Sequence, residues 1–465
     1  MSSSSRASGE ARDHSWSTST HDSEAWANEF FDIDFPTLTK DNSPISISSV
    51  DIPPDEHFCR SETSVSGWFS RGPFSAESPQ LLRHYLESTA DYMAVKQPHE
   101  NPFITLILPF AYTDDLLMHT VLATSGIHLS GRTLAASELV KTTWQHCQAA
   151  VMSLRSELQN ATTMSRFRRV RLVVVLMMLC HFEALSGNEE GAIFHHLNAS
   201  RHLLESILAS NEASLTKDSR DLEGFAFEVN AYLALVVDIA PFVDAPPARK
   251  IPQDSFITSL QYLQKYDTFG AFFSCGYPLF EKISAITLLF NKRLAEEERR
   301  VLCSEGITSS YLSLQESILA WKSSPPSHDM ERWKSEHLAA GELYRRALLI
   351  YLNAALYGSV IDHLKAIGEL QEHAEIGLEH IELMWASPYK AIMLWPLMMV
   401  GSCLLSKSHR DRIRLDFETD ASDLIHVRKA CKLITWLWEH KDRRAYGPFG
   451  LHFVMEERGV HYCLA

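Results

Sequence analysis

The sequence lacks the short motifs that most directly indicate an enzyme. None of the patterns G-x-S-x-G, G-x-G-x-x-G, G-x-x-x-x-G-K-[ST] or H-E-x-x-H occurs in its 465 residues. These patterns build nucleophile elbows, dinucleotide sites, phosphate loops and zinc protease sites. We therefore expect no enzyme activity, and we assign no catalytic residue, no metal ligand and no cofactor.

Paired cysteines are also missing. The chain has eight cysteines, and no C-x-x-C spacing occurs among them. This excludes a zinc finger or a dithiol redox motif of the usual spacing. We expect the cysteines to be reduced intracellular thiols, several of them packed in the core.

Positive charge and long apolar runs are scarce. The net charge of −15 disfavours DNA binding by the bulk surface, because an acidic surface repels phosphates. The first residues, MSSSSRASGEARD, have no apolar core, so we expect no secretory signal. The longest apolar runs, Leu172 to Cys180 and Ile392 to Val400, are far shorter than the roughly 20 residues of a membrane span. We expect both runs to be buried helices and expect no membrane association.

Residues 1–76 differ from the rest of the chain, and we predict a disordered, acidic, Ser-rich tail there. Residues 1–75 contain 18 Ser, and five Lys or Arg against twelve Asp or Glu. Such a composition cannot bury enough apolar surface to offset the entropy lost on ordering. Within the tail, Glu24 to Thr39 alternates acids with aromatic residues, as acidic activation segments do. The alternative is a linker that carries a few aromatic residues.

Residues 77–465 predict an all-α domain with many helices. Apolar residues recur at 3–4 spacing in long segments, and no stretch alternates convincingly as a strand does. Ser78 before Pro79 predicts one helix start, and Asn101 before Pro102 predicts another. Pro109 should end or kink the second helix. The predicted linkers are Pro241 to Pro252, Ser323 to Asp329 and Ser406 to Ser422.

The stretch TDDLLMHTVLATSGIHL, from Thr113 to Leu129, contains acids and histidines that could form a site. We predict that Thr113 caps a helix whose first turn holds Asp114 and Asp115, where the helix dipole favours anions. A prenyl-diphosphate site would need D-D-x-x-D, and Met118 occupies the fifth position. His119 and His128 fall on opposite sides of a continuous helix, so they cannot share a metal ion. We interpret the stretch as scaffold.

Two further groups could bind metal, and we interpret both as structural. His195 and His202 are two helical turns apart, too far to share one ion, and His196 lies on a different face. We predict a polar face and groove for these histidines. The helix QEHAEIGLEHIE carries no Glu three residues before a His, so it does not fit a di-iron bundle. We expect a solvated acidic face formed by Glu372, Glu375, Glu379 and Glu382.

Two basic clusters could serve nuclear import or nucleic-acid contact. The first comprises Arg166, Arg168, Arg169 and Arg171, and the second Lys441, Arg443 and Arg444. A solvated helix end is the commoner role of such clusters. We assign no DNA-binding residue, and we leave the ligand-binding residues unknown.

Several segments, in order, resemble one family. They are LLRHYLESTADYMA, NPFITLILPFAYTDDLLMHTVLATSGIHL, LMMLCHFEALSGNEEGAIFHHLNASRHLL, GYPLFEKISAITLL, ELYRRALLIYL, MLWPLMMVGSCLL followed by RDRI, and VRKACKLITWLWEHKD with FGLHFVMEERG. Together they resemble the fungal-specific transcription factor domain of regulators related to the acriflavine sensitivity control protein. The resemblance covers roughly residues 77–460.

The resemblance implies a nuclear transcriptional regulator with a helical regulatory domain. Most members carry a binuclear zinc cluster of six cysteines, whereas Cys59 is the one cysteine before residue 77. We therefore expect action through protein partners or a small-molecule effector, with DNA contacted indirectly or through a zinc cluster absent from this sequence. The alternatives are a helical adaptor without a transcriptional role and a terpene-synthase-like helical enzyme. The oligomeric state, the target genes and the choice between activation and repression stay open.

Overall fold

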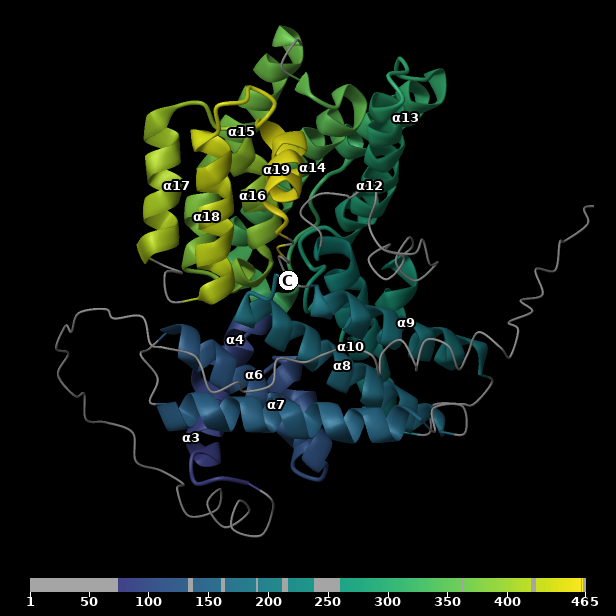
Figure 1. Ribbon diagram of the computed structural model, residues 1–465. Helices are drawn as coiled ribbons and strands as arrows, with labels where there is room; N and C mark the ends of the chain where they lie inside the picture. Colours follow the sequence, from purple (N-terminus) through teal and green to yellow (C-terminus); the bar gives the residue numbers. More distant parts are fainter. Residues whose placement is uncertain are drawn as a thin grey trace, which may run out of the picture.

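The computed structural model describes residues 74–132, 137–159, 164–189, 191–210, 216–237, 260–360, 363–419, 424–460 and 462. Across these ranges all regular secondary structure is helical, so the predicted all-α class is confirmed (Figure 1). The predicted disordered tail lies outside the described residues up to residue 73. The predicted linker Pro241 to Pro252 also lies outside them.

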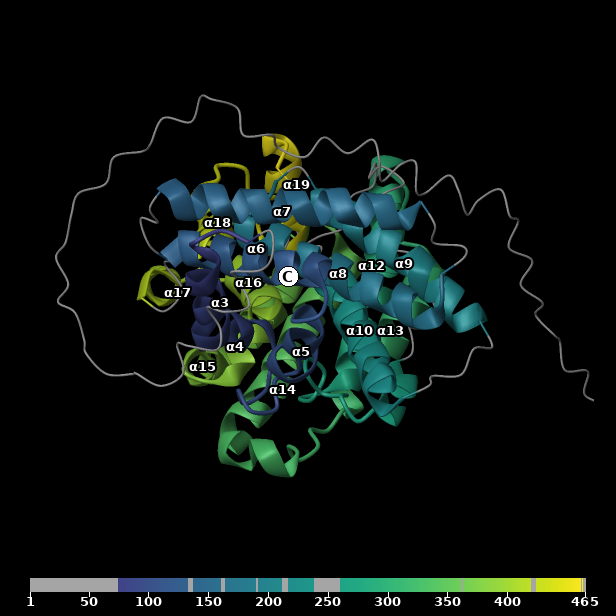
Figure 2. The same cartoon turned by 90° about the horizontal axis from the view of Figure 1, so that it is seen from below.

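The helices form two lobes. The N-terminal lobe occupies the lower part of Figure 1, with the long helix α7 running across it, and the C-terminal lobe occupies the upper part. Figure 2 shows the N-terminal lobe from below. The helices of the N-terminal lobe are α3 (Ser78–His84), α4 (Ala90–Met93), α5 (Leu108–Ala111), α6 (Asp115–Arg132), α7 (Ser137–Leu158), α8 (Arg166–Ser186), α9 (Ala192–Ala209) and α10 (Lys217–Val236).

The C-terminal lobe follows a connecting segment that contains the 3₁₀ helix Leu260–Lys265. Its helices are α12 (Tyr277–Glu298), α13 (Glu305–Ala320), α14 (Lys334–Tyr357), α15 (Leu364–Trp385), α16 (Leu394–Ser402), α17 (Lys407–Thr419), α18 (Ile425–Glu439) and α19 (Gly447–Arg458). Short 3₁₀ helices, His328–Trp333 and Pro388–Ile392, precede α14 and α16.

The two longest apolar runs are buried helices, as predicted. Leu172 to Cys180 lies within α8. The run Ile392 to Val400 starts at the last residue of the 3₁₀ helix Pro388–Ile392 and continues in α16 from Leu394. Helices that are apolar on every side need protein on every side, so these two occupy the centres of their lobes. Among the described residues, no helix has the length and apolar content required to cross a bilayer.

Predicted helix starts are correct to within a few residues. Helix α3 begins at Ser78 with Glu77 at its cap position, so the predicted cap, Ser78, is wrong by one residue; the Ser78 hydroxyl accepts the amide hydrogen of Ser75 at 3.1 Å. The cap of α6 is Asp114, whose Oδ1 accepts the amide hydrogen of Leu117 at 3.0 Å; the predicted cap, Thr113, is wrong by one residue. Helix α9 begins at Ala192, and just before it the side-chain oxygen of Asn188 accepts the amide hydrogen of Gly191 at 3.1 Å.

Pro109 lies inside helical structure, where the sequence predicts a break or kink. Asn101 begins this segment as predicted, since its Oδ1 accepts the amide hydrogen of Phe103 at 2.9 Å. Residues Phe103–Ile107 form a π-helix, and α5 continues through Pro109 to Ala111. Proline removes one amide donor and crowds the preceding turn. The wider π-helical turn accommodates this disturbance without ending the helix.

Helix α17 contradicts the predicted linker from Ser406 to Ser422. The segment is highly polar, but it contains neither Gly nor Pro, and the described residues form the helix Lys407–Thr419. Ile413 and Phe417, four residues apart, are both buried. These two apolar residues lie on one face and anchor the helix in the core. Two apolar positions are too few to predict a helix from apolar periodicity.

A column of stacked aromatic side chains joins the lobes. Tyr232 of α10 stacks on Phe272, with ring centroids 4.5 Å apart and planes at 20°. Tyr232 also contacts Phe280 of α12, which lies 4.3 Å from Tyr344 of α14. Tyr344 in turn stacks on Trp395 of α16, with planes at 11°. The column therefore passes from the N-terminal lobe into the centre of the C-terminal lobe.

Candidate functional site

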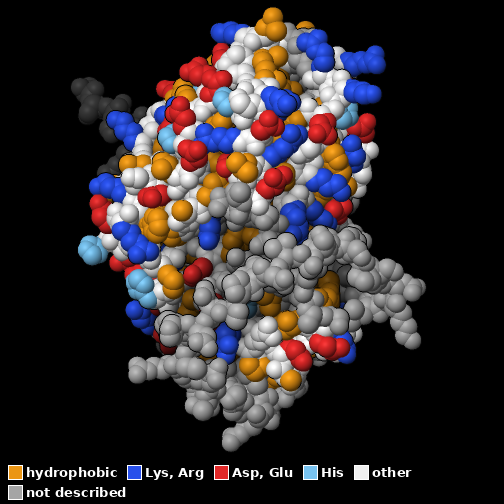
Figure 3. All heavy atoms as spheres, turned by 90° about the vertical axis from the view of Figure 1, so that its left-hand side faces the viewer, with side chains coloured by type: hydrophobic (Ala, Val, Ile, Leu, Met, Phe, Trp, Pro, Cys, Tyr) orange, Lys and Arg blue, Asp and Glu red, His pale blue; other side chains and the backbone are white. Residues whose placement is uncertain are grey.

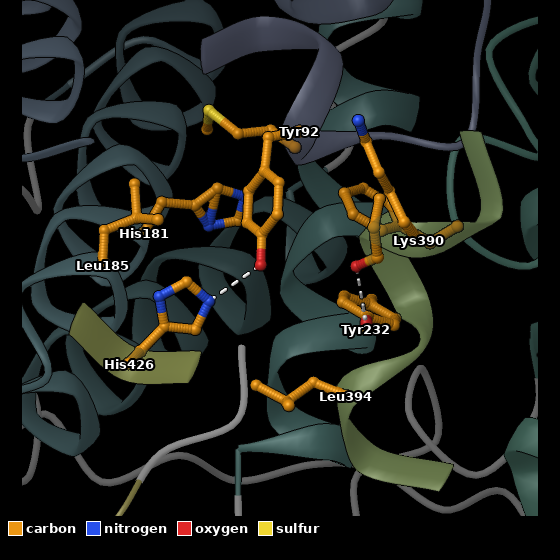
Figure 4. A pocket seen from close by; sticks show the side chains of 10 residues that line it. Tyr92, His181, Leu185, Tyr232, Lys390, Leu394 and His426 are labelled. Atoms are coloured by element: carbon orange, nitrogen blue, oxygen red, sulfur yellow. Dashed lines mark hydrogen bonds between the residues drawn. The ribbon is translucent and has the colours of Figure 1, made fainter. Parts of the chain in front are cut away.

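A small cavity lies between the lobes, beside the aromatic column. The N-terminal lobe contributes α4, α8 and α10 to its wall, and the C-terminal lobe contributes the segment before α16, α16 itself and α18 (Figure 4). The lining residues are Tyr92, Met93, His181, Leu185, Tyr232, Phe272, Lys390, Ala391, Leu394 and His426. Its volume is about 30 Å³. That volume holds one or two water molecules, whereas drug-sized ligands occupy roughly 300–1,000 Å³.

The polar side of the cavity is formed by Tyr92, His181 and His426. Tyr92 and His426 are hydrogen-bonded between the tyrosine hydroxyl and Nε2 at 2.9 Å, which links α4 to α18 (Figure 4). Burial, reinforced by the neighbouring His181, lowers the pKa of His426 to about 3. Burial alone lowers the pKa of His181 to about 4. Both imidazoles are therefore neutral at physiological pH.

Each histidine presents a ring nitrogen that has no protein partner. The Nδ1 atoms of His181 and His426 are buried and make no hydrogen bond to any described residue. If the tyrosine hydroxyl donates to Nε2 of His426, then Nδ1 of that ring carries the proton. A buried polar atom without a partner is costly, and a cavity of this size allows water to supply one. The arrangement suits water or a small uncharged polar molecule.

The apolar wall opposite depends on a buried carboxylate. Glu228 of α10 accepts the amide hydrogen of Phe272 at 2.9 Å and that of Gly270 at 3.1 Å. Its Oε1 also accepts from the amide of Phe273 at 3.4 Å. Burial raises the pKa of Glu228 to about 7, although the three amides oppose this shift. The carboxyl group fixes the loop that carries Phe272 against Tyr232.

Lys390 lies at the rim of the cavity and is exposed to solvent. Burial raises the pKa of Asp91 on α4, and the positive charge of Lys390 partly opposes that rise. The charged groups are therefore at the edge of the cavity, and its interior is neutral.

The acids and histidines of residues 113–129 make contacts within the helical scaffold. Asp114 caps α6 and forms an ion pair with Arg171 of α8. His119 Nδ1 lies 2.7 Å from Nδ1 of His146 on α7. His128 Nδ1, on the opposite side of α6, lies 2.9 Å from the hydroxyl of Thr89. The two histidines therefore have separate partners and do not converge on one ion.

The other proposed metal ligands are not brought together. His196 is fully buried and lies 3.9 Å from Glu183, so the predicted polar face does not extend to it. His202 is half-buried and pairs with Glu205 at 3.6 Å. Glu372, Glu375, Glu379 and Glu382 are exposed on α15, which confirms the predicted solvated face. No group of three or more potential ligands forms a metal site within the described residues.

The first basic cluster is neither a solvated helix end nor a free basic patch. Arg166 makes two hydrogen bonds to the carboxylate of Glu223, at 2.7 and 2.9 Å, and a third to the carbonyl of Ile207 at 2.8 Å. Arg171 pairs with Glu157 at 2.6 Å as well as with Asp114. These arginines tie α8 to α6, α7, α9 and α10. Both interpretations offered by the sequence are therefore wrong for Arg166 and Arg171.

The second cluster lies at the surface beyond α18. Lys441, Arg443 and Arg444 are exposed, and Arg444 pairs with Asp442 at 2.7 Å. Figure 3 shows the face of the molecule at the left of Figure 1, where basic, acidic and apolar side chains are interspersed. On that face the charges do not gather into one basic surface.

Tyr92, His181 and His426 were missed as a group by the sequence analysis. One signal was available: His181 directly follows the apolar run that ends at Cys180, and a histidine in such a position is commonly buried. The contact between Tyr92 and His426 joins residues more than 300 positions apart, and no spacing rule reaches that far. The six described cysteines form no disulfide with one another, and four of them are buried, as expected for core thiols.

The fold and the site together define an all-helical domain whose two lobes meet at a small neutral cavity. Residues 80–465 match the model of the family described as the fungal specific transcription factor domain, so the chain belongs to that family. The match spans both lobes and confirms the resemblance seen in the sequence. No match was found among curated proteins, and none was found among solved structures.

Proposed function

We propose that this protein is a fungal transcriptional regulator that acts in the nucleus and affects transcription by binding other proteins. The observation that supports this most is family membership over residues 80–465, which include both lobes. The neutral, water-sized cavity offers no chemistry that favours catalysis over binding. A large effector would have to separate the lobes before it could enter this cavity, and we favour a protein partner as the ligand of the domain.

Contact with DNA is proposed to be indirect or to use a module outside this sequence. The densest basic cluster is engaged by Glu157, Glu223 and Asp114, which leaves little free charge for phosphates. A cluster of six cysteines, the usual DNA-reading module of the family, is not encoded in these residues.

The test is to tether the full chain to a heterologous DNA-binding module upstream of a reporter gene in a fungal host. We expect reporter output to change several-fold relative to the module alone, and a fluorescently tagged chain to collect in the nucleus. Replacing Phe30 and Phe31 by Ala should reduce activation if the segment Glu24 to Thr39 activates. Replacing Ser46 and Ser48 by Ala is the matched control. Unchanged reporter output together with nuclear exclusion would favour a helical adaptor instead.

A further inference from the structure

The exposed side of α18 carries a row of basic and aromatic side chains. Arg428, Lys432 and Trp436 recur every four residues, so they follow one another along one side of the helix. Arg458, from the end of α19, lies over the same indole, with its Cζ 4.1 Å from the ring centroid. Lys432 Nζ lies 4.8 Å from that centroid. We call these four residues the Trp436 surface.

Two cations of the Trp436 surface, Lys432 and Arg458, are not neutralised by acids of the described residues. Within the described residues Lys432 and Arg458 form no ion pair, although both are exposed. Neighbouring cations differ: Lys429 pairs with Glu189 at 2.7 Å, and Arg414 pairs with Glu439 at 3.4 Å.

The acids closest in sequence to Arg458 are directed to other partners. Glu457 pairs with His440 at 2.8 Å, and Glu456 lies 3.6 Å from His452. An indole flanked by two unpaired cations is suited to a ligand that brings carboxylates and aromatic rings together.

The chain itself contains a segment of that chemistry. Glu24 to Thr39 carries four carboxylates and the aromatic residues Trp26, Phe30, Phe31 and Phe35, and its first basic neighbour is Lys40. The residues between Thr39 and Phe74 can span about 100 Å when extended, at roughly 3.3 Å each. Because the segment belongs to the same chain, its binding to the domain surface is intramolecular and has a higher effective concentration than binding of a free peptide.

We propose that the Trp436 surface binds the acidic-aromatic segment Glu24 to Thr39 of the same chain. Carboxylates of the segment pair with Lys432 and Arg458, and an aromatic side chain packs at the edge of Trp436. Because surface ion pairs are screened by salt, the contact weakens as ionic strength rises. A partner that takes up the segment must displace it from the domain, so the domain controls access to the segment. The contact does not depend on the proposed transcriptional role.

The test measures backbone hydrogen exchange of residues 24–39 in the full chain. We expect exchange in the wild type to be several-fold slower than in a free peptide of the same sequence, and to accelerate in high salt. The double variant Lys432→Glu/Arg458→Glu should abolish the slowing. Adding Asp32→Lys/Asp34→Lys to that variant should restore it, since the charges are then exchanged. The control Lys292→Glu/Lys322→Glu reverses two exposed charges on other elements and should leave exchange unchanged.

Each other outcome overturns the proposal. Exchange as fast as in the free peptide means that the segment is not bound. Slow exchange that survives Lys432→Glu/Arg458→Glu places the segment elsewhere. Slowing that grows with protein concentration means that a second copy supplies the segment. Unchanged circular dichroism and unchanged thermal unfolding establish that the surface variants fold, so a loss of slowing is then due to the lost contact. These outcomes are read without a reporter gene, so they are independent of the transcriptional test.

Discussion

Individual arginines in the first basic cluster differ in what they stabilise, although the sequence presents them as equivalent. Arg166 is largely buried and binds a buried carboxylate, whereas Arg168 is 56% exposed and reaches Glu157 at 3.4 Å. Removing one partner of a buried pair leaves the other charged and unpaired, at a cost of about 3–5 kcal/mol. Exposed pairs contribute about 0–1 kcal/mol.

We therefore expect Arg166→Ala to lower the free energy of unfolding by about 3 kcal/mol or more, and Arg168→Ala to lower it by less than about 1 kcal/mol. Urea unfolding of the two variants, followed by circular dichroism, measures the difference. Equal losses in the two variants would contradict the role assigned to Arg166.

Glu228 is the second residue with a specific structural role, because three backbone amides converge on its carboxyl group. Glu228→Ala leaves these buried donors unpaired, and each unpaired donor costs about 1–3 kcal/mol. We expect this variant to lose at least about 3 kcal/mol of unfolding free energy, and Glu228→Gln to lose less because one acceptor oxygen remains. Urea titration distinguishes them, and a Gln variant as unstable as the Ala variant would show that the negative charge is essential.

At the scale of single helices, the glycine that ends α14 has a conformation unavailable to other residues at low cost. Gly358 has φ of +62°, and an added Cβ would lie 1.9 Å from a carboxylate oxygen of Glu297. We expect Gly358→Ala to destabilise the fold by about 1–3 kcal/mol, through backbone strain and displacement of Glu297.

Gly368 provides the control, since it is exposed within α15 and an added Cβ meets nothing within 4 Å. Alanine at that position should stabilise the helix by up to about 1 kcal/mol. Both variants exchange Gly for Ala, but we expect Gly358→Ala to lower the melting temperature and Gly368→Ala to raise it. A rise in melting temperature for Gly358→Ala would refute the strain argument.

At the scale of the whole molecule, stability should depend on pH through buried neutral histidines. Burial, with the neighbouring His119, lowers the pKa of His146 to about 3, and burial lowers that of His181 to about 4. The unfolded chain takes up protons at these sites below pH 6.5, while the folded chain does not until pH 3–4. Each such group therefore removes up to about 1.4 kcal/mol of stability per pH unit within that window.

Variant His146→Gln isolates one of these groups. If His146 is neutral in the fold, the stability gap between wild type and variant narrows as pH falls from 7 to 4, because only the wild type carries the proton penalty. Urea midpoints at several pH values measure the gap. Glu228 acts oppositely, because its raised pKa removes stability as the pH rises from 4.5 to 7. Wild type and variant both retain Glu228, so its contribution cancels in the gap between them. A gap independent of pH would mean that folding leaves the pKa of His146 unchanged.

The sequence predicted those features that depend on local patterning and missed those that depend on distant contacts. The apolar run Leu172 to Cys180 was long enough to predict a buried helix, which α8 confirms. The helix Lys407–Thr419 has only Ile413 and Phe417 in the core, so its composition resembled a linker. Arg166 was taken for a surface charge because its partner Glu223 is 57 residues away. The cavity needs residues from both lobes, and no local rule relates Tyr92 to His426.

The π-helical turn at Phe103–Ile107 has a consequence for how the chain tolerates changes in length. A π-helix closes its hydrogen bonds over five residues in place of four, so the turn holds one residue more than an α-helical turn does. Deleting one residue there would restore α-helical spacing upstream of Pro109 and leave the residues on either side close to their present orientation, because the wide turn absorbs the extra residue. Asn101 would keep its capping position, and α6 and the rest of the lobe would keep their register. We therefore expect an alignment of relatives to place single-residue gaps at this turn more readily than in α6 or α8.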